Sequence, residues 1–344
     1  MQNSRLWGQV RRPLAAGAAM GVLLFLLPLL ALGKGGETVE VLPPSPTPVA
    51  SAGTEPAAAG GADARITLRV LQKDGQVTEM TMADYLWRVV AAEMPASFEP
   101  QALRAQAVCA RTYSCWKMAA GSHEEDGADI CADSSCCQAY IEPAEAAERW
   151  EQNGETYTAK IAQAVADTDG LILTYDGEPI QAAFFSSSTA ATEDAAAVWG
   201  NSLPYLVSVA SPEGDEVPNY HSTVVLTAEE LAGMTKAVYA DADLSGDPSG
   251  WIGGITYTAS GRVAELRVGG VTLSGGAARA LFGLRSACFR VEESEGVFTF
   301  SVVGYGHGVG MSQYGANAMA REGSSWQEIV THYYTGVDIQ PVEL

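Results

Sequence analysis

The stretch that decides the fold spans residues 82–113 and reads MADYLWRVVAAEMPASFEPQALRAQAVCARTY. Apolar residues recur at helical spacing over 82–94. Pro95 ends this helix, because proline lacks the backbone N–H that would continue it. Ser97 is a suitable N-cap for a second helix that runs to about Ala120. The sequence therefore predicts two consecutive helices with a short break between them.

Shorter elements surround these two helices. Residues 65–71 alternate apolar and polar side chains, as a strand does, and 171–175 and 180–186 are predicted to form a hairpin. Further strands are predicted over 206–210, 222–226, 254–257, 263–268, 271–273 and 297–303, and further helices over 142–150, 157–168, 316–322 and 326–334. The predicted class is α+β, with one domain of two closely joined lobes over residues 65–340.

The N-terminal part has a different composition. Residues 13–33 form one uncharged Leu- and Ala-rich run, and about 20 such residues span a bilayer as a transmembrane helix. Arg11 and Arg12 precede this run, which predicts residues 1–12 as a cytoplasmic tail. Residues 34–64, rich in Pro and Ala, are predicted to be a disordered linker or stalk. The sequence thus predicts a single-pass protein of the cell membrane with an extracytoplasmic C-terminal domain; a cleaved signal peptide is the alternative.

The charge of the chain limits its partners. The formal net charge is −21, from 41 acidic and 20 basic residues. A chain this acidic repels nucleic acid and anionic lipid surfaces. We therefore expect no nucleic acid partner and a substrate that is neutral or weakly charged.

Glu93 is the first candidate catalytic residue. It shares the apolar stripe of the first helix with Leu86, Val89 and Val90, at positions i, i+3, i+4 and i+7. A carboxyl group on that stripe loses solvation, which raises its pKa, and a general acid at neutral pH needs such a pKa. The alternative, which the pattern alone favours, is an ordinary glutamate that reaches water at a helix end.

A second candidate site is the glycine-rich segment 304–315, which reads GYGHGVGMSQYG. Glycines allow a close approach of backbone to backbone or ligand. The candidate sugar-binding side chains within the segment are Tyr305, His307, Ser312, Gln313 and Tyr314. His307 is expected to titrate near neutrality, and the whole segment is expected beside Glu93. A tight structural loop is the alternative, and the missing Gly-Lys-Ser/Thr ending excludes a phosphate loop.

The third candidate is a loop that contains His123, Cys131, Cys136 and Cys137. Three thiols and one imidazole this close in sequence can bind zinc. In an exported protein the same thiols can instead form disulfides. The spacing alone does not decide between zinc and oxidation.

Several of these blocks together resemble one family. They are VVAAEMP at 89–95, SFEPQALRAQAVCARTY at 97–113, TE at 192–193, VWG at 198–200, LPYL at 203–206, the glycine-rich segment, and HYYTGV at 332–337. In this order they resemble stage II sporulation protein D and its relatives that modify cell-wall amidases. The resemblance covers about residues 65–340.

The resemblance implies a peptidoglycan lytic transglycosylase that acts in forespore engulfment during sporulation. Such an enzyme cuts the bond between N-acetylmuramic acid and N-acetylglucosamine in glycan strands without stem peptides, and Glu93 would be its acid and base. The resemblance also implies one zinc ion on His123, Cys131 and Cys137. Cys136 stands where relatives often have histidine, so it could compete as a ligand.

The resemblance further implies a place and partners for the protein. It would lie in the mother-cell membrane facing the forespore, with an engulfment amidase/endopeptidase and a membrane scaffold protein as partners. The alternative function is that of a non-catalytic activator of a cell-wall N-acetylmuramoyl-L-alanine amidase.

Overall fold

A computed structural model describes residues 61–343. The predicted α+β class is confirmed, and the buried apolar side chains form two separate clusters. The first cluster, which we call the helical lobe, is built by helices and strands from both ends of the described chain. The second, which we call the β lobe, is built by residues 221–303.

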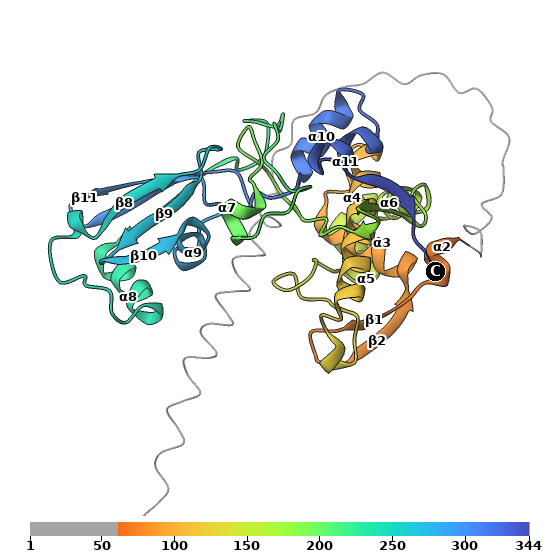
Figure 1. Cartoon of the computed structure of the whole chain (residues 1–344), viewed down its shortest axis with the longest axis horizontal. Coiled ribbons are helices and arrows are strands. Elements are labelled where there is room, and N and C mark those ends of the chain that lie inside the picture. Colours follow the sequence, from red (N-terminus) through yellow and green to blue (C-terminus); the bar gives the residue numbers. More distant parts are fainter. Residues whose placement is uncertain (1–60, 344) are drawn as a thin grey trace, which may run out of the picture. The chain divides into compact units, whose positions relative to one another are not determined.

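The helical lobe is organised around α4, which packs against α3, α6, α10, α11 and β4 (Figure 1). Its helices are α2 (Ala62–Arg65), α3 (Met82–Glu93), α4 (Pro100–Ala120), α5 (Pro143–Trp150), α6 (Gly154–Ala166), α7 (Ala195–Trp199), α10 (Gln313–Arg321) and α11 (Trp326–Tyr333). Short 3₁₀ turns cover Glu124–Asp126 and Glu151–Asn153. The hydroxyl of Thr81 accepts a hydrogen bond from the backbone N–H of Asp84 and so caps α3.

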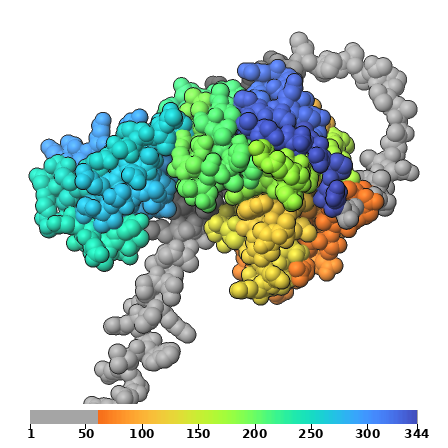
Figure 2. Space-filling view, viewed as in Figure 1, coloured from red at the N-terminus to blue at the C-terminus, as the bar shows by residue number. Residues whose placement is uncertain are grey.

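Three small sheets belong to this lobe. They have the orders β2-β1-β3, β14-β4-β5 and β13-β6. The strands are β1 (Thr67–Leu71), β2 (Val77–Thr81), β3 (Ile130–Cys131), β4 (Leu171–Tyr175), β5 (Glu178–Pro179), β6 (Phe184–Phe185), β13 (Met311–Ser312) and β14 (Asp338–Pro341). Because β14 pairs with β4, the dark blue C-terminal segment lies against the yellow-green surface near β4 (Figure 2).

The β lobe consists of two three-stranded antiparallel sheets, with the orders β10-β9-β8 and β11-β12-β7. Its strands are β7 (His221–Thr227), β8 (Ile252–Tyr257), β9 (Val263–Val268), β10 (Val271–Ser274), β11 (Phe289–Ser294) and β12 (Val297–Val303). Helices α8 (Ala228–Val238) and α9 (Gly275–Leu281) and a 3₁₀ turn at Pro248–Gly250 complete it. Phe282, Phe289 and Phe300 lie in its core, each exposed by 1% or less.

Several local predictions are corrected. Ser97 makes no cap, and α4 begins at Pro100 with Glu99 as its N-cap residue. Residues 206–210 form no strand, because their backbone bonds to the loop at 192–195 instead of to a ladder. Asp63, just before the predicted start of the domain at residue 65, is buried and pairs with Arg111 at 2.6 Å.

The predicted membrane location is also corrected. Within residues 61–343, no helix has the length and apolar character needed to cross a membrane. The predicted tail (1–12), transmembrane helix (13–33) and most of the linker (34–64) lie outside the described residues.

Candidate active site and cysteine–histidine cluster

Glu93 is the last residue of α3, and two hydrogen bonds hold its half-buried carboxyl group. The backbone N–H of Ala139 donates to Oε1 at 2.6 Å, and Nε2 of Gln313 donates to Oε2 at 3.3 Å. The segment before Ala139 is the cysteine-bearing loop, and Gln313 belongs to the glycine-rich segment. The prediction that the glycine-rich segment lies beside Glu93 is therefore confirmed.

The surroundings of Glu93 favour its protonated form. Burial raises the pKa of Glu93 above its ordinary value, while the hydrogen bonds from Ala139 and Gln313 oppose that rise by stabilising the carboxylate. The net direction is upward. A carboxyl group of this kind can donate a proton nearer neutral pH and is still stabilised after the proton leaves.

Gln313 is positioned by buried polar groups. It is the first residue of α10, is 5% exposed, and also donates to Oε1 of Gln106 on α4 at 3.4 Å. The Nε2 of Gln106 has no hydrogen-bond partner among the described residues. Residues of α3 and α10 thus meet at the Glu93 carboxyl group, and Gln106 of α4 holds the Gln313 amide that bonds to it.

The glycines of the segment are needed for close backbone contact. Gly310 has a φ of +78°, and a Cβ at that position would lie 2.0 Å from the carbonyl oxygen of Ala183. A Cβ on Gly315 would lie 2.1 Å from the hydroxyl of Tyr333. No other residue fits at these positions without movement of the backbone or of a buried side chain.

His307 is held by the backbone through both of its ring nitrogens. Nε2 donates to the carbonyl oxygen of Phe184 at 3.0 Å, and Nδ1 accepts from the N–H of Val309 at 3.1 Å. Burial and the positive charge of Arg279 lower the pKa of His307 to about 4. The expectation that it titrates near neutrality is wrong, and neither nitrogen is free for a sugar hydroxyl.

The hydroxyl of Ser312 is likewise occupied by hydrogen bonds within the protein. It is completely buried, caps α10 by accepting from the N–H of Gly315, and donates to the carboxylate of Glu213. Glu213 is 4% exposed and also accepts from the N–H of Ser188 at 2.5 Å and the hydroxyl of Ser211 at 2.6 Å. We call this group of residues the Glu213 cage. Sequence reasoning missed it, since an isolated glutamate in a loop gives no signal of burial.

Tyr305 and Tyr314 lie half-buried, and neither hydroxyl forms a hydrogen bond within residues 61–343. The ring of Tyr305 stacks on the guanidinium of Arg285 at 4.1 Å, and the ring of Tyr314 meets Phe98 edge-on at 4.9 Å. Burial raises the pKa of Tyr305, and the negative charge of Glu93 adds to that rise. The two tyrosines can therefore offer hydroxyl groups to a ligand near Glu93.

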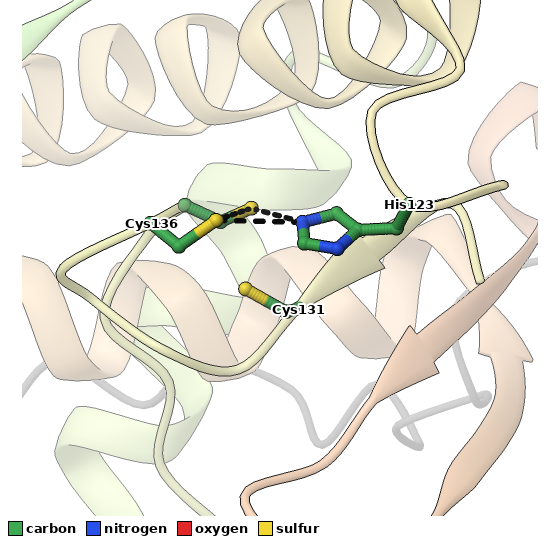
Figure 3. A group of neighbouring side chains, drawn as sticks. His123, Cys131 and Cys136 are labelled. Carbon is green, nitrogen blue, oxygen red and sulfur yellow. Dashed lines mark hydrogen bonds between the residues drawn. The ribbon is translucent and has the colours of Figure 1, made fainter. Parts of the chain in front are cut away.

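The predicted cysteine and histidine residues form one cluster (Figure 3). The ligand atoms of His123, Cys131, Cys136 and Cys137 all lie within 4.8 Å of one another. Nε2 of His123 lies 3.3 Å from Sγ of Cys137 and 3.5 Å from Sγ of Cys136, and these two sulfurs are 3.8 Å apart. All six cysteines of the chain are free thiols in this structure.

These distances fit a tetrahedral zinc ion. With Zn–S distances of about 2.3 Å and a Zn–N distance of about 2.0 Å, tetrahedral angles separate two sulfurs by about 3.8 Å and a sulfur from the nitrogen by about 3.5 Å. Nδ1 of His123, which would remain free, lies 3.4 Å from Oδ2 of Asp126. Metal-binding imidazoles commonly use such a carboxylate to fix their orientation.

The cluster is directly connected to the Glu93 site. Cys137 precedes Gln138, whose buried amide donates to the hydroxyl of Ser114 on α4 at 3.2 Å. The next residue, Ala139, supplies the N–H that Glu93 accepts. The loop that carries the cluster therefore also forms one wall of the candidate active site.

Known proteins resemble this chain over most of its length. Residues 72–175 match the family model described as stage II sporulation protein. Stage II sporulation protein D of Bacillus subtilis (strain 168) is 38% identical over 296 residues, which cover 84% of each protein. The protein of that name from Bacillus amyloliquefaciens is 39% identical over 78% of this chain and 76% of its own length. The amidase enhancer of Bacillus subtilis (strain 168) is 28% identical over 73% of this chain and 39% of its own length.

Two proteins named stage II sporulation protein D are 38% and 39% identical to this chain over more than two thirds of its length. The segment that matches the family model also contains Glu93 and the cysteine–histidine cluster. The resemblance inferred from the sequence blocks is thereby confirmed. The chain belongs to the stage II sporulation protein D family.

Proposed function

We propose that the protein is a lytic transglycosylase that cleaves peptidoglycan glycan strands during sporulation. The observation that carries this proposal is the carboxyl group of Glu93, which has a raised pKa and is held by Ala139 and Gln313. The names of the relatives support a role in sporulation. The proposed substrate is a strand without stem peptides, cut between N-acetylmuramic acid and N-acetylglucosamine.

In the proposed reaction Glu93 acts twice. It first protonates the glycosidic oxygen, and the bond from that oxygen to the anomeric carbon of muramic acid breaks. The resulting carboxylate then takes the proton of the 6-hydroxyl on the same sugar, and that oxygen bonds to the anomeric carbon. The product has a 1,6-anhydro end, Glu93 recovers its proton, and neither a water nucleophile nor a second carboxylate is required, unlike in the usual hydrolases.

The neighbouring groups suit both steps. The Ala139 N–H and the Gln313 amide stabilise the carboxylate that exists between the two proton transfers. The hydroxyls of Tyr305 and Tyr314, which have no partner in the described part of the chain, can hold the sugar and orient its 6-hydroxyl. We assign His307 and Ser312 to the support of this segment, since their polar atoms are occupied by the protein itself.

We also propose that the cysteine–histidine cluster binds one zinc ion. His123, Cys131 and Cys137 would hold it, with Cys136 as the fourth ligand. Bound zinc would hold the loop in one conformation, and the proposed reaction does not involve it. The loop's own contribution to the reaction is the N–H of Ala139.

A second candidate function is activation of a cell-wall amidase, which the amidase enhancer among the relatives supports. The two functions predict different results when purified protein is incubated with peptide-free glycan strands and no amidase. A transglycosylase releases fragments with 1,6-anhydro ends, which mass spectrometry detects. An activator leaves these strands intact and acts only when the amidase and peptide-bearing strands are present.

A further inference from the structure

Arg285 lies in the loop between α9 and β11 and is fixed by its backbone. Its carbonyl oxygen accepts from Nε of Arg279 and from the N–H of Gly306, both at 3.0 Å. Its guanidinium stacks on the ring of Tyr305 at 4.1 Å. These contacts hold one side chain of the β lobe against the glycine-rich segment.

Arg285 is partly buried and has no anionic partner within residues 61–343, in contrast to two fully buried arginines. Arg111 is paired with Asp63 at 2.6 Å, and Arg262 lies 3.7 Å from Glu193. Within residues 61–343, no carboxylate forms an ion pair with Arg285, and its buried Nε has no hydrogen-bond partner. A partly buried cation without a counterion is costly, so an anion from outside the protein would be favoured there.

Backbone hydrogen bonds connect Arg285 to the Glu93 site. Tyr305, on which Arg285 stacks, exchanges two backbone hydrogen bonds with Ser187, at 2.9 and 3.0 Å. The adjacent residue Ser186 accepts from the N–H of Tyr314, the neighbour of Gln313. Arg285, Tyr305, Tyr314 and Gln313 therefore belong to one connected group that ends at Glu93.

The chemistry of the substrate suggests which anion this is. In a peptide-free strand the only charged group of the repeating unit is the carboxylate on the lactyl ether of muramic acid, which a stem peptide converts to an amide. We propose that the Arg285 guanidinium binds this carboxylate and so selects muramic acid residues without a stem peptide. The proposal rests on the proposed function, and the planar guanidinium suits a carboxylate through two parallel hydrogen bonds.

The test uses the full chain and two forms of peptide-free strands, one native and one with its carboxylates converted to primary amides. For the wild type we expect kcat/KM to be about 10- to 100-fold lower on the amide form, as for loss of a hydrogen-bonded charge. Arg285→Gln should show this loss on the native strands and no further loss on the amide form. Arg285→Lys should keep part of the preference, because it keeps the charge without the planar fork.

Arg290→Gln is the matched control, because Arg290 stacks on Tyr257 at the same 4.1 Å and is exposed. It should behave as the wild type. The proposal would be overturned if the wild type cleaved both strand forms with equal kcat/KM. It would also be overturned if Arg285→Gln lowered kcat/KM equally on both forms. Dissociation constants for the two strand forms, measured with Glu93→Gln protein, test carboxylate binding by Arg285 separately from the proposed cleavage activity. A preference for native strands supports Arg285 even if no cleavage occurs.

Discussion

Two neighbouring residues of the glycine-rich segment contact two glutamates of opposite character. Ser312 donates to Glu213, which is 4% exposed and also accepts from Ser188 and Ser211. Gln313 donates to Glu93 at 3.3 Å, and within residues 61–343 the only other bond to that carboxyl comes from Ala139. The carboxylate of Glu213 is enclosed by donors, whereas Glu93 is half-buried and weakly held on one side.

The difference shows how one segment can both hold a structure and serve a reaction. A carboxylate with three donors joins the chain segments that supply them, and a proton or a ligand can reach it only if those bonds break. A carboxyl group with two donors and a raised pKa can exchange a proton. The predictions below test this distinction between Glu93 and Glu213, beginning with the largest expected effect.

Glu93→Gln should reduce kcat for glycan cleavage by at least about 10²–10⁴-fold, because it removes the proton that both steps transfer. The measurement is the release of 1,6-anhydro fragments. Glu148→Gln, on the exposed face of α5, is the control and should keep full activity. Undiminished release by Glu93→Gln protein would remove the catalytic assignment.

The same variant should not lose stability. Since the folded state raises the pKa of Glu93, ionisation of this group is less favourable in the folded than in the unfolded chain. The stabilisation that it provides is present below its unfolded pKa and is lost as the pH rises through its folded pKa. Denaturant titrations should therefore find Glu93→Gln at least as stable as the wild type at neutral pH.

Glu213→Gln should have the opposite pattern, with a loss of stability as its primary effect. The amide presents N–H groups where the cage needs an acceptor, so we expect unfolding to become easier by about 2–3 kcal/mol, the scale of one hydrogen bond to a charged group. Urea unfolding at neutral pH measures this. If Glu213→Gln protein is as stable as the wild type but inactive, Glu213 is a second functional carboxylate and the comparison fails.

Cys131→Ser tests the support of Glu93 from the cysteine–histidine loop. If the cluster binds zinc, the purified wild type should contain about one zinc ion per chain, and the variant should contain less. The loop would then hold the Ala139 N–H less firmly, and we expect activity to fall by about tenfold, the smaller end of the effect of losing one positioned donor. Cys115→Ser, outside the cluster, is the control. A metal-free wild type with a Cys131–Cys137 disulfide, found by mass mapping, would contradict this prediction.

The sequence predicted the features that depend on local pattern. The break between α3 and α4 follows from Pro95, and the helix predicted over 326–334 is present as α11, which a capping box of Ser325 and Glu328 begins. The helix α8 was missed although Thr227 and Glu230 form the same box. The strand β2 was missed for a physical reason, because its residues are exposed or only half-buried and so lack an apolar side.

The site was predicted less completely, because several contacts depend on residues distant in the chain. Glu93, Gln313 and the cysteine–histidine loop could be named as candidates from apolar periodicity, glycine content and thiol spacing, and the family resemblance supplied the expected role of Glu93. Arg285 could not be predicted as a site residue, since nothing in the sequence around it distinguishes it from a surface arginine. The hydrogen bonds that occupy His307 and Ser312 could not be predicted either, because their partners, Phe184 and Glu213, are distant in the chain.

Gln313→Met should have the smallest effect and tests the weak hydrogen bond on the Glu93 side of the comparison. The methionine keeps the length and burial of the side chain but cannot donate, so kcat/KM at neutral pH should change by about fivefold, the equivalent of a hydrogen bond of about 1 kcal/mol. The pH profile gives the sharper measurement. Activity requires protonated Glu93 in the free enzyme, so kcat/KM falls as the pH rises through its pKa. The Gln313 bond stabilises the carboxylate and lowers that pKa, so its loss should move the alkaline limb of the profile to higher pH. Glu148→Gln, on the exposed face of α5, leaves this bond intact and should leave the limb in place. A Gln313→Met profile with an unmoved limb would mean that Gln313 does not act on Glu93, and a limb moved to lower pH would mean that water enters the site when the amide is removed.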